Sequence, residues 1–286
     1  MNQTRNIQTA KSHKLMVFVL TMSLYGLATL FSELIPKFQV GIVEFSVEYF
    51  LFIPLTLAML FDPISVALGA AMGELVFSEI MLGQFGGLGE LEKFLTVTIA
   101  VAIAGYLVKN PKNIKAVGFA AMFGVVLQLA MSAGVDILKV VFAVEDFEAV
   151  SGLPQSVFAT EGFAFLNDVL FSGILFCLLP TLYLVPKLYG KIEPLLGIKP
   201  REKGIENEEG SSVTLKMGII AIIGFAVAVG SEFLAESGMS LIDWEAEWSE
   251  NTTSLIIGIA VAAIIAIISI TLLLKSKNKK ISGLPN

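Results

Sequence analysis

The chain has 286 residues and a formal net charge of −6; 55% of its residues are hydrophobic, 15% are charged, and its mean hydropathy is +0.80. Because soluble domains carry about 25% charged residues, this composition excludes a soluble globular protein and indicates one that lies largely in a membrane. The single cysteine, Cys177, excludes an internal disulfide and the single histidine, His13, argues against histidine-based chemistry, so we expect no metal site and no cofactor.

Eight apolar segments are long enough to cross a hydrocarbon core of about 30 Å, which takes about 20 helical residues. They predict an all-α polytopic membrane protein. The second and fourth are short and are expected to be tilted or partly re-entrant at their ends. The eight predicted spans are residues 15–32, 46–61, 64–82, 94–108, 116–142, 162–185, 214–234 and 254–274.

Lysine and arginine residues gather in alternate connections. Sixteen of the nineteen lie before the first span, around the connections between the fourth and fifth and between the sixth and seventh, or after the eighth; the exceptions are Lys37, Lys93 and Lys139. With an even number of spans these groups fall on one side of the membrane, which the positive-inside rule makes the cytoplasmic side. The sequence therefore predicts a multi-pass protein of the cell membrane with both termini in the cytoplasm.

A charged segment that carries proline and glycine, KIEPLLGIKPREKGIENEEGSS, follows the sixth span and is typical of a cytoplasmic linker. It divides the chain into a six-span substrate-binding membrane unit (1–190), a linker (191–213) and a two-span hairpin with a basic tail (214–286). The exterior loop of the hairpin contains SLIDWEAEWSE, in which Ser240 and Asp243 fit a capping box. Its tryptophans predict a short amphipathic helix at the membrane interface.

The third span combines small residues with two carboxylates. Ser65, Gly69 and Gly73 are spaced by four, a pattern that lets another helix approach closely. Glu74 is expected about 16 Å from the inner end of this helix, and Glu79 near its outer end. Because a carboxylate near mid-bilayer costs about 2.5 to 3.5 kcal/mol, we expect Glu74 either to be protonated or bonded to a neighbouring helix, or to meet a polar cavity.

Other polar residues also lie in the outer half of the six-span unit, whereas its inner half is almost entirely apolar. Conduction pores and symmetric exchangers need polar groups along their whole depth, but a cup that captures a solute needs them only at the top. Because ionisable groups inside a membrane usually serve function, we interpret the outer groups as a binding site and assign no catalytic residue. The substrate-binding candidates are Glu48, Glu79, Gln84, Gln128, Asp136, Lys139, Asn167 and Asp168.

Two segments of this unit resemble parts of a known family. AMLFDPISVALGAAMGELVF (58–77) is an apolar run that ends in a tight Asp-Pro corner and continues as a small-residue helix with an acidic residue. FLNDVLFSGILFCLLPTLYLVPKLYG (165–190) is a final helix that starts with an Asn-containing segment. With six spans and cytoplasmic ends, residues 1–190 resemble the substrate-binding S component of energy-coupling factor (ECF) vitamin transporters.

The resemblance implies that exterior loops 33–48, 82–93 and 143–161 form a vitamin pocket together with the outer helix ends. It also implies docking on a coupling transmembrane subunit driven by two ATPase subunits, through a helix-one motif that appears here as Ala28-xxx-Ser32. The chain has no P-loop, so we expect a transport subunit and not an enzyme. Four outer carboxylates against one lysine favour a small cationic solute, such as a thiamine-like or pyrimidine vitamin.

Two other classes fit the composition. A polytopic membrane enzyme acting on a lipid-like substrate usually presents clustered carboxylates or histidines near the cytoplasmic face, where this chain offers only Asp62 and linker charges. A structural subunit of a membrane complex would need no binding site at the outer end. In all three classes the chain is surrounded by the lipid bilayer, and no nucleic-acid partner is expected.

Overall fold

The computed structural model describes residues 2–35, 38–40, 43–45, 50–147, 150, 152–200 and 215–238. The chain divides into two compact units, Met1–Trp244 and Glu245–Asn286, and every described residue belongs to the first unit. The predicted eighth span and the predicted interfacial helix at 240–250 therefore lie outside the described residues.

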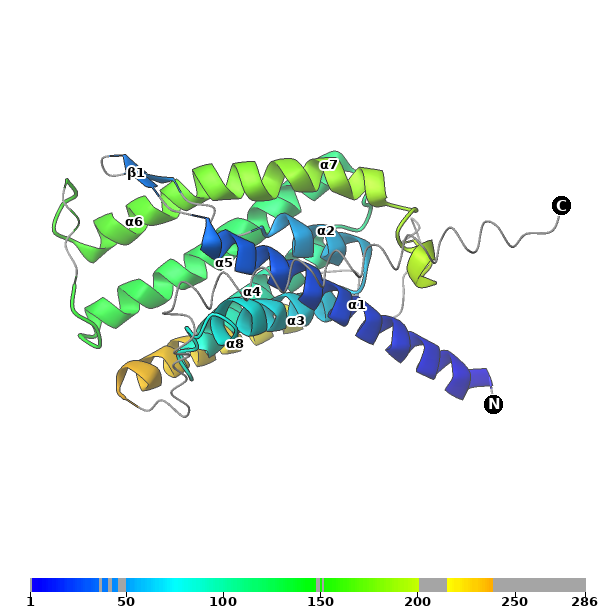
Figure 1. Cartoon of the computed structure of the whole chain (residues 1–286), viewed down its shortest axis with the longest axis horizontal. Helices are drawn as coiled ribbons and strands as arrows, with labels where there is room; N and C mark the ends of the chain where they lie inside the picture. The colour runs from blue at the N-terminus through cyan, green and yellow to red at the C-terminus, as the bar shows by residue number, and fades with distance from the viewer. Residues whose placement is uncertain are drawn as a thin grey trace, which may run out of the picture. The chain divides into compact units, whose positions relative to one another are not determined.

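Most of the described part of the chain is helical, and its two strands, β1 and β2, form one short antiparallel hairpin with Val40 opposite Val43 (Figure 1). Two helices continue directly into π-helical segments, η1 after α3 and η2 between α6 and α7. The elements are, in chain order, α1 (Asn2–Leu34), β1 (Phe38–Val40), β2 (Val43–Phe45), α2 (Phe52–Leu60), α3 (Pro63–Glu74), η1 (Leu75–Ile80), α4 (Glu90–Leu107), α5 (Ile114–Val141), α6 (Val157–Asp168), η2 (Val169–Leu178), α7 (Leu179–Leu188), η3 (Pro194–Leu196) and α8 (Leu215–Glu236).

Among the described residues, five helices are long and apolar enough to cross a membrane. They correspond to the first, third, fifth, sixth and seventh predicted spans, which indicates a polytopic helical membrane protein. The fourth predicted span forms α4, whose first turn carries several charged residues. The five helices are Lys11–Leu34, Pro63–Ile80, Ile114–Val141, Val157–Leu188 and Leu215–Glu236.

The second predicted span (46–61) does not form one long helix. Its helical part is the nine-residue α2, which is about 14 Å long and too short to cross a core of about 30 Å. Two prolines set its limits, because Pro54 is tolerated only in the first turn of a helix and Pro63 disfavours helical backbone at Asp62 before it. The predicted span 46–61, expected to be short and partly re-entrant, thus contains a helix of only nine residues.

Helices α1 and α3 are in close parallel contact. A Cβ on Gly69 would lie 2.4 Å from the carbonyl oxygen of Phe18, and a Cβ on Gly73 would lie 2.4 Å from that of Met22. Both contacts advance by four residues in the same direction, so the two helices run parallel. Gly69 and Gly73 of the small-residue stripe therefore lie at a close contact between two helices. Because α1 and α3 are parallel, the chain must return between them, and α2 is the helical part of that return.

The short helix α2 lies in the hydrophobic core, and seven of its nine residues are buried. Glycines let the neighbouring helices approach it: a Cβ on Gly105 of α4 would lie 2.8 Å from Ala58, and one on Gly124 of α5 would lie 3.1 Å from Leu55. Helices α1, α3, α4, α5 and α7 all contact α2. Its apolar sequence is therefore used for packing within the bundle.

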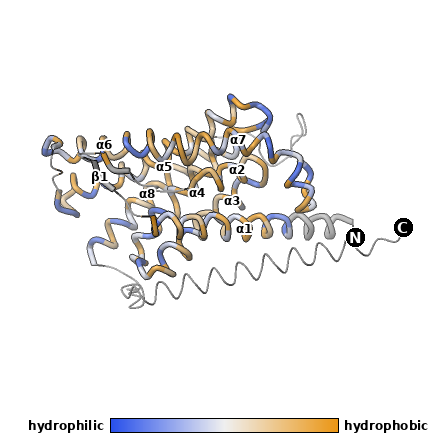
Figure 2. The backbone as a smooth tube through the Cα atoms, turned by 45° about the horizontal axis from the view of Figure 1, so that its top comes forward, coloured by the Kyte–Doolittle hydropathy of each residue, from blue (hydrophilic) through white to orange (hydrophobic). Residues whose placement is uncertain are grey.

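The long helices carry large exposed apolar side chains. Phe119 of α5, Leu170 of η2 and Ile222 of α8 are 65%, 62% and 71% exposed. Exposed apolar surface of this extent is uncommon on soluble proteins and is expected where helices face lipid. Figure 2 shows hydrophobic residues along the helices and hydrophilic ones gathering toward their ends.

The two ends of the bundle differ in charge. The acidic end, where η1 and the helices α5 and α8 end and α4 and α6 begin, lies at the left of Figure 1. At the opposite, basic end, Lys14 of α1 forms an ion pair with Asp62 at 3.6 Å. Asp62 is also the N-cap of α3, because its Oδ2 accepts the N–H of Ser65 at 2.9 Å.

The first ten residues of the predicted linker, 191–200, fold against the basic end. Ile192, Leu196 and Ile198 pack against the core. Glu193 is fully buried and accepts the N–H of Gly190 at 2.8 Å. These apolar contacts explain why the segment belongs to the bundle; the rest of the predicted linker lies outside the described residues.

Candidate functional site

The first turn of α4 stands between two groups of polar side chains at the acidic end. Its two glutamates, Glu90 and Glu92, are 8% and 7% exposed. A helix N-terminus favours carboxylates in its first turn, which explains why α4 begins with them. Glu90 and Lys93 contact η1 and the loop after it, whereas Glu92 contacts α5.

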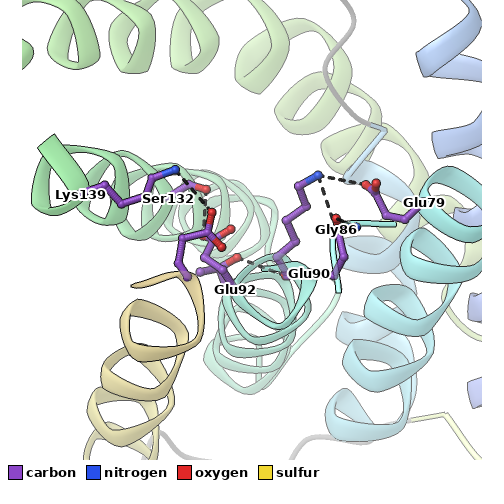
Figure 3. A network of polar contacts seen from close by, with 9 residues as sticks. Glu79, Gly86, Glu90, Glu92, Ser132 and Lys139 are labelled. Carbon is purple, nitrogen blue, oxygen red and sulfur yellow. Dashed lines mark hydrogen bonds and ion pairs between the residues drawn. The ribbon is translucent and has the colours of Figure 1, made fainter. Parts of the chain in front are cut away.

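Lys93 is the centre of the first group. Its Nζ lies 3.0 Å from Glu79 Oε1 and 3.8 Å from Glu90 Oε2. Glu90 also accepts the backbone N–H of Gly86 through Oε1 at 3.2 Å, which ties the loop 81–89 to the start of α4 (Figure 3). Glu79 and Glu90, which lie eleven residues apart in the sequence, thus share one ammonium group.

Glu74 lies beside this lysine. It hydrogen-bonds to the side chain of Tyr25 on α1, and its Oε2 atom is buried without a hydrogen-bond partner among the described residues. A void of about 10 Å³ is lined by Glu74, Glu79, Glu90 and Lys93 together with apolar neighbours. We call these four charged residues and their void the Lys93 pocket.

Lys139 of α5 is the centre of the second group. Its Nζ lies 3.0 Å from Glu145, 3.2 Å from Asp136 and 3.4 Å from Glu232 of α8. Its side chain is only 11% exposed, so these ion pairs are partly shielded from water. The network joins α5 to α8, which packs on both α4 and α5.

A groove runs between α5 and α6 next to this network. Its volume is about 210 Å³. Three carboxylates line it, Asp136 from α5 and Glu161 and Asp168 from α6, together with the amide of Gln128 and the hydroxyl of Ser132. We call it the α5–α6 groove.

The groove and the first turn of α4 are directly connected. Ser132 donates a hydrogen bond to Glu92 Oε1 at 3.0 Å (Figure 3). Gln128 has a buried Oε1 atom with no hydrogen-bond partner in the described part of the chain. A groove with an excess of carboxylates and an unused amide oxygen can accept hydrogen bonds from a cationic donor. Within the described residues, no three acidic, histidine or cysteine side chains are placed to hold a metal ion.

A family model described as "Family of unknown function (DUF8171)" matches residues 16–282. The chain belongs to this family. No curated protein and no solved structure matches it. The match continues through the seventh and eighth predicted spans, so the DUF8171 family includes the segment beyond the six-span unit.

In this DUF8171 chain the structure brings three of the predicted binding residues together, since Gln128, Asp136 and Asp168 all line the α5–α6 groove. Asn167 is half-buried on α6, next to Asp168 in the sequence, and does not line the groove. Lys139 is held in its ion pairs beside Asp136.

The remaining predicted residues lie elsewhere. Glu79 belongs to the Lys93 pocket, and Gln84 is exposed in the loop after η1. The side chain of Glu48 lies outside the described residues. Of the predicted docking motif, Ala28 is half-buried and Ser32 is 4% exposed with its hydroxyl bonded to the carbonyl of Thr29, so Ser32 offers almost no surface to a partner.

Several polar residues of the acidic end were not predicted as site residues. Ser132 could have been found, because it lies four residues from both Gln128 and Asp136 and hence on the same helix face. Glu232 could not, because no local pattern shows that α8 reaches Lys139. Glu90 and Lys93 were placed in a loop by the sequence, although Glu90 begins α4.

Proposed function

We propose that this protein is the substrate-capture subunit of a membrane importer and binds a small cationic solute in the α5–α6 groove. The observation that carries the proposal is the lining of the groove, where Asp136, Glu161 and Asp168 surround a space of about 210 Å³. Ligand pockets of drug-sized molecules measure about 300 to 1,000 Å³, so the groove suits a smaller solute. Organic ammonium or pyrimidinium groups would match its carboxylates.

The charge distribution supports an orientation with the groove outside. The basic end carries Lys14, Lys112 and Lys187 on or beside the helix ends, and positively charged helix ends usually face the cytoplasm. The acidic end then faces outward, where a negative potential concentrates cationic solutes. In this orientation the protein would capture its solute from outside. By its resemblance to S components of ECF transporters, we propose that a separate coupling subunit with two ATPases delivers the solute.

Calorimetric titration of the purified full chain with a panel of cationic vitamins, thiamine among them, tests the binding step. We expect saturable binding of at least one member, with affinity reduced about tenfold or more in Asp136→Asn and Asp168→Asn, because each removes a charge worth about 1.4 kcal/mol or more. Asp146→Asn is the matched control, since Asp146 is exposed at the same end and does not line the groove. Absence of binding across the panel, or equal affinity in all variants, would overturn the proposal.

A structural subunit of a membrane complex is the second candidate, and the Lys139 network favours it. Three carboxylates from two helices and a loop converge on one lysine, as expected of groups that hold a bundle together. For this candidate, Asp136→Asn would lower stability and leave solute uptake by whole cells unchanged. Uptake that is lost while the variant still inserts and folds favours solute capture.

A further inference from the structure

The Lys93 pocket is separate from the α5–α6 groove, because no residue lines both. It is built from three elements: Glu74 ends α3, Glu79 lies in η1, and Glu90 and Lys93 belong to α4. π-helical segments are rare and often occur at functional sites, and here η1 carries Glu79 and directly follows Glu74.

Charge is unbalanced in this pocket. Three carboxylates face one ammonium group, and among the described residues Lys93 forms ion pairs within 4 Å with Glu79 and Glu90. Glu90 is 8% exposed, and its Oε2 has no hydrogen-bond partner among the described residues. The Oε2 of Glu74 is buried and equally without a hydrogen bond in that part of the chain. Lys93 Nζ lies 3.8 Å from the Glu90 oxygen, whereas no ion pair reaches the Glu74 oxygen among the described residues. Because a buried charge without a partner is costly, the Glu74 oxygen needs a further ligand.

The size of the void restricts that ligand. About 10 Å³ is close to the smallest space that holds one water molecule. The three carboxylates are not arranged to coordinate a metal ion. A proton fits both observations, since it needs no coordination sphere and turns a carboxylate oxygen into a hydrogen-bond donor.

We propose that the Lys93 pocket binds one exchangeable proton, carried by Glu74 and passed to it from Glu90 across the void. The charged and titratable groups that face these two carboxyls are Tyr25 from α1, Glu79 from η1, Lys93 from α4 and Glu232 from α8. The proton enters from the acidic end, because Lys93 lines the pocket and its side chain is 51% exposed there. The acidic end thereby responds to the pH on its own side of the membrane.

Infrared spectroscopy of the full chain in detergent or nanodiscs tests this site without any solute, so the result is independent of the importer proposal. The C=O stretching band of protonated carboxylic acids is recorded at neutral pH and during titration to alkaline pH. We expect the wild type to show this band and Glu74→Gln to lose absorbance equal to one carboxyl per chain. Glutamine preserves the size of the side chain and its hydrogen bond with Tyr25, so the variant should fold.

Glu236→Gln is the control, because Glu236 is exposed at the end of α8, and its spectrum should match the wild type. The band that disappears in Glu74→Gln should also disappear reversibly in the wild type as the pH rises. Identical bands in the wild type and in Glu74→Gln, or a Glu74 band that does not respond to pH, would overturn the proposal. A further variant, Lys93→Met, removes the only ammonium of the pocket and should increase the band; a decrease would contradict the charge argument.

Discussion

Ser132 on α5 donates a hydrogen bond to Glu92 on α4 over 3.0 Å, joining the lining of the groove to the first turn of the neighbouring helix. Glu92 is 7% exposed, so water competes little for this bond. The same turn of α4 carries Glu90 and Lys93 of the Lys93 pocket. The two polar sites of the acidic end are therefore anchored on one rigid turn.

The bond between Ser132 and Glu92 should be measurable by a double-mutant cycle. Hydrogen bonds to charged groups contribute about 1.5 to 3 kcal/mol, although those between membrane helices average nearer 0.6 kcal/mol. We expect a coupling free energy of about 1 kcal/mol from the unfolding of Ser132→Ala, Glu92→Gln and the double variant in mixed micelles. Strict additivity of the two single changes would show that the bond contributes nothing.

Gly69→Ala should weaken the packing of α1 against α3 and lower the stability of the protein. Its Cβ would lie 2.4 Å from the carbonyl oxygen of Phe18, and backbone cannot yield as a flexible side chain does, so we expect a loss of about 1 to 3 kcal/mol of unfolding free energy. Gly162→Ala in α6 is the matched control, since nothing lies within 4 Å of its Cβ position. That change should gain about 0.5 to 1 kcal/mol. Equal thermal stability of the two variants would argue against the parallel packing.

Asp62 both caps α3 and pairs with Lys14, and two substitutions separate these roles. Asp62→Ala should cost about 1 kcal/mol, the usual value of an N-cap. Asp62→Asn keeps a good cap and loses only the ion pair, whose side chains are 53% and 30% exposed, so it should cost a few tenths of a kcal/mol at most. Thermal unfolding midpoints should fall in that order; an equal loss in both variants would make the ion pair the important contact.

Lys139→Met should weaken the contact between α8 and α5 and lower the unfolding free energy. Removing one partner of a buried ion pair costs about 3 to 5 kcal/mol, and the exposure of Asp136 and Glu145, each 46%, reduces this to about 2 kcal/mol. Adding Glu232→Gln to that variant should restore part of the loss, because one unpaired carboxylate is removed. Protease cleavage and thermal unfolding in detergent measure both effects, and failure of the second change to restore any stability would exclude Glu232 as a partner.

Local features of the fold could be predicted from the sequence because they depend on short-range chemistry. The membrane class follows from composition, and five of the eight predicted spans correspond to long apolar helices. The stripe Ser65, Gly69 and Gly73 predicted a close helix contact by its spacing alone. The position of Pro54 could also have limited α2, since a proline in the helix interior breaks the backbone hydrogen bonding.

The sites depended on contacts between residues that are far apart in the chain. Gln128, Asp136 and Asp168 were recognised as polar residues in apolar spans, but only the packing of α5 against α6 places them around one groove. Glu79 and Lys139 were recognised by the same signal, and the structure instead pairs Glu79 with Lys93 and Lys139 with three carboxylates.

The sequence by itself determined that this protein lies in a lipid bilayer and at which end of the bundle its acidic residues gather. Hydrophobicity and charge are properties of single residues, so neither result depends on the packing. What only the tertiary structure decided was which charges meet. Glu232 binds Lys139 although 93 residues separate them in the sequence. Glu74 at the end of α3 and Glu90 at the start of α4 line the same void. Such pairings depend on helix register and crossing, and these are fixed by the packing of the whole bundle.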